Sequence, residues 1–214
     1  MIIRKAQESD IPQIIELLRV SLGESLIPKS EVLWRWKHLD NPFGASPVIL
    51  AELDGKLIGV RAFLRWEFWG DGAIHKACRA VDTAVHPGHQ GQGVFKKLTL
   101  SLIEEVEKEG IDLIYNTPNA DSLPGYLKMG WEKWGKLALT LHFHLNSNKN
   151  KHSINPRSWG EIEMIVSNIE ADSTTYGQTY LKPGYLSWRY QDSPICPYHF
   201  ISNGSSYLLF YRIK

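Results

Sequence analysis

The sequence predicts an α/β fold built on one mixed sheet, antiparallel at first and parallel where a helix crosses over. Residues 48–85 alternate strand-like segments with glycine turns, which is typical of an antiparallel meander. A glycine-rich loop, an amphipathic stripe at helical spacing and a short apolar run follow, as in a parallel strand–helix–strand unit. The composition, with 43% hydrophobic and 22% charged residues, is that of a globular protein and excludes a disordered chain.

The first elements are a short strand and two helices. Residues 2–6 predict the strand. We expect Asp10 to be the N-cap of the first helix, with Gln13 as its capping-box partner. Apolar side chains then repeat at helical spacing until Gly23. A second, tryptophan-rich helix is expected to end before Pro42, because the residue before a proline avoids helical geometry.

Three strands make up the predicted meander. The segments 48–53 and 57–68 flank the dipeptide Asp54–Gly55, which is a strong hairpin signal. A second glycine turn leads to a third strand over residues 74–85. This alternation gives the antiparallel half of the sheet.

The hydrophobic period then changes from that of strands to that of helices. After the loop at 87–93, a helical apolar stripe runs to Gly110, which we expect to cap the helix. Residues 111–116 predict a buried parallel strand, because the run is short and apolar. A short helix over 119–129 and a long final strand over 131–145 complete the sheet.

The chain is expected to divide into a domain at 1–145, a linker at 146–157 and a C-terminal extension at 158–214. The linker is polar and without periodicity. Residues 33–36 (Leu-Trp-Arg-Trp) and 186–190 (Leu-Ser-Trp-Arg-Tyr) each precede a proline and a strand–glycine–strand segment. This echo favours a partial internal repeat, in which the extension is the opening of a second copy that stops after its hairpin.

Charge and cysteine usage exclude several classes of function. Lys plus Arg number 24 against 23 Asp plus Glu, so no basic surface for nucleic acid or an anionic membrane is expected. No apolar run is long enough for a transmembrane helix, and the N-terminus turns polar too early for a signal peptide. Cys78 and Cys196 have no partner motif, which favours a reducing cytoplasm. His86 and His89 lack further ligands, so no metal is expected.

The glycine loop offers chemistry of its own. Glycines at 88, 91 and 93 permit positive φ and let a ligand approach the backbone. The first-turn amides of the following helix have no intrahelical partners and favour an anion such as a diphosphate. A plain strand-to-helix turn needs glycine as well, so both alternatives stay open. The loop lacks the third glycine of the dinucleotide fingerprint and the Gly-Lys pair of a P-loop.

Two segments resemble motifs of the GNAT superfamily, the acyl-CoA-dependent N-acyltransferases. Residues 90–95 (Gln-Gly-Gln-Gly-Val-Phe) resemble its Q/R-x-x-G-x-G/A motif. Residues 119–131 resemble its N-x-x-A/S-x-x-x-Y-x-x-x-G-F/W segment. The resemblance covers about residues 1–145 and implies a GNAT-like fold with acetyl-CoA as co-substrate. It implies that the diphosphate is bound by Gln90, Gly91, Gln92, Gly93, Val94 and Phe95.

Phe95 departs from the family pattern, which usually has Gly or Ala at that position. A bulky side chain there must point into the core, or it would crowd the diphosphate. Phe95 falls on the apolar stripe of the helix, so we expect it to face the core.

The resemblance also implies that the end of the third meander strand and one polar side chain bind the cofactor. The backbone from Thr83 to Val85 would bind the pantetheine arm in the manner of an added strand. Val85 also fits a buried strand residue. Asn119 would contact the cofactor, although the N-cap of a short helix explains it as well.

Tyr126 lies in the second motif and is the expected general acid. A phenol, with an ordinary pKa of about 10, can protonate a thiolate leaving group within hydrogen-bond reach. The alternative is that Tyr126 is a packed aromatic at the end of a short helix.

Asp82 is the candidate general base. It is an acidic residue among apolar neighbours in the third meander strand, where burial would raise the pKa of its carboxyl. The alternative is that Asp82 pairs with Arg79 or Arg61. Glu67, His75 or a water chain are other candidates for the base.

We therefore expect transfer of an acetyl or short acyl group from acetyl-CoA to a primary amine, by direct attack in a ternary complex. The acceptor is expected to be a small molecule or a protein amine, with no nucleic-acid or membrane partner, and a homodimer stays open. Two alternatives remain. The same fold could use an aminoacyl-tRNA or acyl carrier protein donor, or it could be a non-catalytic ligand-binding module.

Overall fold

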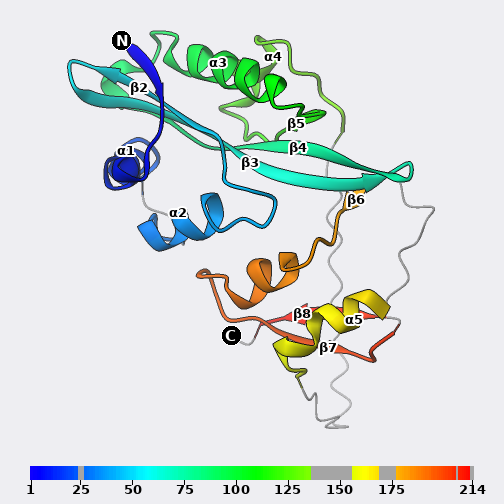
Figure 1. The fold of residues 1–214 in the computed structure, drawn as a ribbon. Coiled ribbons are helices and arrows are strands. Elements are labelled where there is room, and N and C mark those ends of the chain that lie inside the picture. The colour runs from blue at the N-terminus through cyan, green and yellow to red at the C-terminus, as the bar shows by residue number, and fades with distance from the viewer. Residues whose placement is uncertain (24–26, 136–155, 169–176, 206, 213–214) are drawn as a thin grey trace.

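A mixed sheet with helices on both faces forms the centre of the molecule (Figure 1). The computed structural model describes residues 1–23, 27–135, 156–168, 177–205 and 207–212 of the 214-residue chain. The spatial order is β1-β2-β3-β4-β5, antiparallel from β1 to β4 and parallel between β4 and β5. The bounds are β1 (Ile2–Lys5), β2 (Val48–Leu53), β3 (Lys56–Gly70), β4 (Ala73–Val85) and β5 (Leu113–Tyr115).

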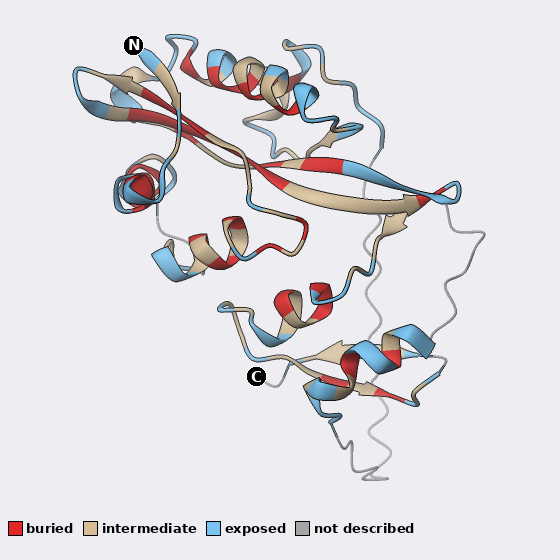
Figure 2. Cartoon of the chain, viewed as in Figure 1, coloured by how far each residue is buried: buried red, intermediate tan, exposed pale blue. Residues whose placement is uncertain are grey.

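Two helices cover each face of this sheet. α1 (Ile11–Leu22) and α2 (Glu31–His38) lie on one face, and α3 (Val94–Lys108) and α4 (Leu123–Leu127) on the other (Figure 1). Buried residues follow the middle strands and the inner sides of α1 and α3 (Figure 2). The predicted mixed α/β fold is confirmed.

Successive residues of β3 serve the two cores in turn, because strand side chains alternate between faces. Val60 and Ala62 pack in the cluster under α1, whereas Phe63 packs in the cluster under α3. Arg61 therefore points to the face that carries α3 and α4, where it contacts Tyr126.

The first helix starts after the predicted N-cap residue, Asp10, but the capping box differs from the prediction. A 3-10 turn, η1 (Glu8–Asp10), precedes α1, so the capping box pairs Gln7 with Asp10. Asp10 is the N-cap residue of α1, as predicted, but its side chain makes no capping hydrogen bond to α1. The carboxylate instead accepts a hydrogen bond from the Gln7 amide at 2.8 Å and forms an ion pair with Arg4 at 2.7 Å. The expected Asp10–Gln13 capping box is therefore wrong.

The hairpin predicted at Asp54–Gly55 is confirmed. Both residues have positive φ, 51° and 74°, as the twist of a tight hairpin requires. Farther along, two residues of β4, Asp82 and Thr83, lie opposite Arg61 alone, which is a β-bulge. Asp82 has a φ of 39°, and its side chain turns toward α2.

β4 and β5 part before β4 ends. Their parallel pairing stops at Arg79 and Tyr115, while β4 continues to Val85. The strand predicted over 111–116 thus exists but is shorter. A strand was also predicted over 131–145. Residues 131–135 form no strand, and residues 136–145 lie outside the described residues.

The extension forms further short elements, shown in yellow to red in Figure 1. Its two-residue strand β6 joins the main sheet beside β3, while β7 and β8 form a hairpin of their own. The elements are η3 (Trp159–Glu161), α5 (Ile162–Asn168), β6 (Gln178–Thr179), the π-helical turn η4 (Ser187–Gln191), β7 (His199–Ser202) and β8 (Leu208–Tyr211). Most of the predicted linker lies outside the described residues.

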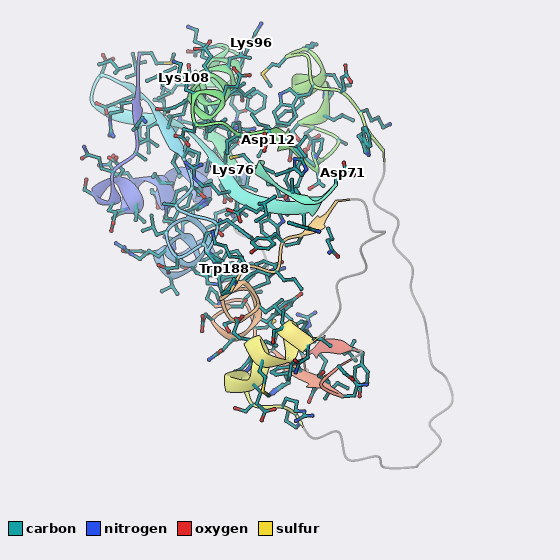
Figure 3. The ribbon with its side chains drawn as sticks, turned by 45° about the vertical axis from the view of Figure 1, so that its right-hand side comes forward. Asp71, Lys76, Lys96, Lys108, Asp112 and Trp188 are labelled. Carbon is teal, nitrogen blue, oxygen red and sulfur yellow. The ribbon has the colours of Figure 1, made fainter. Side chains whose placement is uncertain are left out.

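Two tryptophans, one in α2 and one in the extension, join these two parts of the molecule by making the same contacts with each other. Trp36 and Trp188 stack with ring centroids 4.9 Å apart. The Trp36 indole N–H donates to the Trp188 carbonyl at 2.8 Å, and the Trp188 indole N–H donates to the Trp36 carbonyl at 2.7 Å. Trp188 lies where the extension meets the rest of the molecule (Figure 3).

Residues of α2 and of the extension that meet at this contact are separated by the same number of residues in the sequence. The tryptophans are 152 residues apart in sequence. A pocket of about 700 Å³ between the two parts has five lining pairs with the same spacing. They are Val32 and Gly184, Arg35 and Ser187, Trp36 and Trp188, Asp40 and Asp192, and Pro42 and Pro194. Each set precedes an antiparallel hairpin, which supports the predicted partial repeat.

Candidate active site

The loop before α3 presents a row of free amides. Gly91 and Gly93 have positive φ, 74° and 76°, and Gly93 is the residue at the N-cap of α3. Within the described part of the chain, the backbone N–H groups of residues 91–96 have no protein acceptor. They lie at the positive end of the helix dipole, so the loop can bind an anion.

The space outside this loop is open. A Cβ added at Gly91 or Gly93 would meet no heavy atom within 4 Å. The two glutamine side chains of the motif instead brace the loop. The Gln90 amide donates to the Val85 carbonyl at 3.2 Å, and the Gln92 amide donates to the Gly88 carbonyl at 3.4 Å. The backbone amides are thus the groups that face a ligand.

Phe95 does not join the core as expected. Val94 and Leu98 form the buried stripe of α3, whereas Phe95 is half-buried at its margin. Its ring packs edge-on against Tyr126 with centroids 5.4 Å apart. A Cβ on Gly125 would come within 3.2 Å of the Phe95 ring, so the ring bridges α3 and α4.

The end of β4 keeps an open edge toward β5. From Ala80 to Val85 no residue of β5 pairs with β4. The Val85 carbonyl accepts from Gln90, and the Thr83 hydroxyl oxygen accepts from Arg61. The binding of pantetheine along Thr83–Val85 stays a prediction that this open edge permits.

Tyr126 is buried on α4 between two aromatic rings, those of Phe95 and Trp131. Its hydroxyl oxygen accepts a hydrogen bond from Arg61 Nη1 at 2.7 Å. Tyr126 therefore lies close to both the α3 loop, through Phe95, and the end of β4, through Arg61 and Thr83. The structure brings these predicted site residues together.

Arg61, considered from the sequence only as a possible partner of Asp82, instead contacts Tyr126 and Thr83, and its place beside Tyr126 was not predicted. Its side chain is fully buried, and its guanidinium carbon lies 4.9 Å from the Phe63 ring centroid and 5.3 Å from that of Tyr126. Burial lowers the pKa of the guanidinium below its ordinary value. An arginine inside the apolar segment Ile58–Leu64 was the signal that could have identified it.

Asp82 lies on the opposite face of the sheet and contacts two residues of α2. Its Oδ2 accepts from Lys37 Nζ at 2.5 Å and from His38 Nε2 at 2.8 Å. Burial alone would raise the pKa of Asp82, but the His38 hydrogen bond and the Lys37 charge outweigh it and hold the pKa well below its usual range. The expected raised pKa is wrong, and so is pairing with Arg79, which binds Thr117 instead.

A carboxylate with a low pKa is a poor general base, so the base role of Asp82 loses its physical reason. The geometry instead gives Asp82 a structural role, since Lys37 and His38 hold the bulge residue in its positive-φ conformation. Glu67 and His75 lie toward the far end of the β3–β4 hairpin, where Glu67 pairs with Lys182 of the extension.

His38 is fully buried, and burial lowers its pKa below 6.5. The neutral ring then donates from Nε2 to Asp82 and accepts at Nδ1 from the Ser46 hydroxyl, 2.9 Å away. This chain of hydrogen bonds ties α2 to β4.

The pKa shift of His38 predicts a pH dependence of stability. Below pH 6.5 His38 becomes protonated in the unfolded chain but stays neutral in the folded chain, because burial lowers its pKa there. The free energy of unfolding therefore falls as the pH decreases. The slope from this residue is at most about 1.4 kcal/mol per pH unit. Urea unfolding between pH 7 and 5 should show a smaller slope for His38→Gln than for the original chain. The exposed control His75→Gln should keep the original slope, and an equal slope for all three proteins would contradict the prediction.

Asn119 lies in the turn before α4, whose N-cap residue is Ser122. The Asn119 Oδ1 accepts from the Ser122 amide at 2.9 Å and from the Ser122 hydroxyl at 2.7 Å. Asn119 thus holds the turn before α4 and is not its N-cap residue, and a contact to the cofactor stays a prediction. Among the described residues no group of three or more His, Cys, Asp or Glu could hold a metal ion, and no helix is long and apolar enough to span a bilayer.

Comparison with known proteins decides the family. The model of the acetyltransferase (GNAT) domain matches residues 2–134, which is more than half of the chain. The chain belongs to the GNAT acetyltransferase family. Both sequence motifs lie within the matched range, so the predicted family is confirmed. Acetyl-CoA is the general co-substrate of this family.

Solved structures share the fold. An aminoglycoside acetyltransferase from an uncultured soil metagenomic sample is 21% identical, with a TM-score of 0.51, and the match covers 68% of this chain and 96% of that one. Glucosamine-6-phosphate N-acetyltransferase from Arabidopsis thaliana is 18% identical, with a TM-score of 0.50 and coverage of 67% and 98%. A ribosomal-protein-alanine N-acetyltransferase from Brucella melitensis is 17% identical, with a TM-score of 0.51 and coverage of 66% and 100%. No curated protein gives a significant match.

Proposed function

We propose that this GNAT acetyltransferase transfers an acetyl or short acyl group from acetyl-CoA to the primary amine of a small molecule or a protein. The amine attacks the thioester directly in a ternary complex. The family supports the acetyltransferase class, and the geometry of the loop, of β4 and of α4 supports the finer statement.

The observation that carries the proposal is the row of free amides at residues 91–96. It offers hydrogen-bond donors and a helix dipole to a diphosphate. The open edge of β4 begins beside this loop, since Gln90 of the loop donates to the Val85 carbonyl. A CoA molecule bound with its diphosphate on the amides would extend its pantetheine arm along this edge toward Tyr126.

The chemistry requires a proton for the leaving thiolate. The amine nitrogen forms the new bond to the carbonyl carbon, and the carbon–sulfur bond breaks with its electron pair going to sulfur. Tyr126 donates its hydroxyl proton to that sulfur. The proton of the attacking amine leaves to water, because Asp82 on the far face is held as a low-pKa carboxylate.

Thiol release from acetyl-CoA in the presence of amines tests this function. We would supply glucosamine 6-phosphate, sisomicin and a peptide with N-terminal alanine, which span the acceptor classes named for structural neighbours. The expected result is amine-dependent CoA release with at least one class, above the rate without amine. The proposal would be wrong if no amine raised the rate and the protein did not bind acetyl-CoA.

A further inference from the structure

Arg61 is a buried cation to which no acidic residue of the described chain is paired. Its exposed fraction is 0%, and its only hydrogen-bond partners there are the neutral hydroxyl oxygens of Thr83 and Tyr126. Its Nε and Nη2 atoms have no partner in the described residues. A buried charge without a counter-charge costs stability, so a chain that keeps one is expected to use it.

The surroundings fix the position of the guanidinium. The bulge in β4 places Thr83 on one side of it, and α4 places Tyr126 on the other. The rings of Phe63, Phe95 and Tyr126 lie 4.9, 5.7 and 5.3 Å from its central carbon. These rings exclude water, so the positive charge acts on the phenol with little screening.

Two consequences follow for Tyr126. Because its oxygen accepts a hydrogen bond from Arg61, its own hydrogen must point away from Arg61 and is free for another acceptor. The adjacent cation also stabilises the negative charge that stays on the oxygen once that hydrogen is given away.

We propose that Arg61 is a positioning residue that prepares Tyr126 to protonate the departing CoA thiolate. The inference rests on the proposed function. As the carbon–sulfur bond breaks, the phenol proton passes to sulfur. The phenolate that remains is stabilised by Arg61 and regains a proton from water after CoA leaves.

A double-mutant cycle on turnover tests this inference. Arg61→Met is expected to lower kcat about 100-fold while the KM for acetyl-CoA changes by less than about threefold. In the Tyr126→Phe background the same change should lower kcat by less than about twofold, since Arg61 acts through the phenol. Arg61→Lys, which keeps a charge, should recover part of the activity. The control Arg79→Met, an arginine that also donates to a threonine hydroxyl, should leave kcat unchanged.

Equal loss of kcat in both backgrounds would show a merely structural role and overturn the inference. A second measurement needs no acceptor, namely the ultraviolet titration of the thiol of bound CoA. Its pKa should lie below that of free CoA, and Arg61→Met should abolish the shift, whereas an unchanged shift would contradict the inference. An original chain that binds no CoA would refute the proposed function itself, and the inference with it.

Discussion

Tyr126→Phe is expected to lower the turnover number about 100-fold or more, because proton donation to a leaving group contributes roughly 10²–10⁴ in rate. The ring, its packing against Phe95 and Trp131 and the fold of α4 are all kept, since only one oxygen is removed. The dissociation constant of acetyl-CoA should therefore change by less than about threefold. Initial rates of thiol release and calorimetric titration measure the two quantities.

Tyr115→Phe is the matched control for this change. Tyr115 lies in β5, half-buried against Phe68, and has no role in the proposed chemistry. Its loss of a hydroxyl should leave turnover within about twofold of the original. Unchanged turnover for Tyr126→Phe would exclude the general-acid role.

Trp188→Ala is expected to lower the free energy of unfolding by about 3–5 kcal/mol, as for other buried tryptophans truncated to alanine. Trp188 is 6% exposed, and the change removes its stacking on Trp36 and its indole hydrogen bond. It also exposes Trp36, which belongs to the helix whose Lys37 and His38 hold the β4 bulge. Urea unfolding monitored by circular dichroism measures the loss.

Trp134→Ala provides the control, because Trp134 is fully exposed in the described structure. Its free energy of unfolding should change by less than about 0.5 kcal/mol. If Trp188→Ala and Trp134→Ala unfolded at the same urea concentration as the original chain, the extension would not be part of the cooperative fold.

Features encoded within one short segment could be predicted from the sequence. The glycine loop at 88–93, the segment around Tyr126 and the Asp54–Gly55 turn each carry their signal in adjacent residues. Their backbone conformations follow from local chemistry, mainly from positive φ at glycine.

Features that depend on distant contacts could not be predicted. Asp82 has apolar neighbours in its own strand, but its electrostatic surroundings come from Lys37 and His38, 45 and 44 residues away. Arg61 and Tyr126 are 65 residues apart in sequence. They meet because side chains of β3 alternate between the two faces of the sheet, and Arg61 points to the face that carries α4. The contact of Trp36 with Trp188 likewise spans 152 residues, although the sequence echo drew attention to both segments.

Calorimetric titration with acetyl-CoA tests most directly the claim that the amides at 91–96 hold a diphosphate. The original chain should bind with a dissociation constant in the micromolar range. Gly93→Asp places a negative charge beside the ligand, and a repulsion of about 3 kcal/mol corresponds to about 100-fold weaker binding. Gly110→Asp, at the other end of α3 with nearly the same φ, should bind as the original does. No binding at millimolar acetyl-CoA, or equal affinity for the original and Gly93→Asp, would contradict the claim.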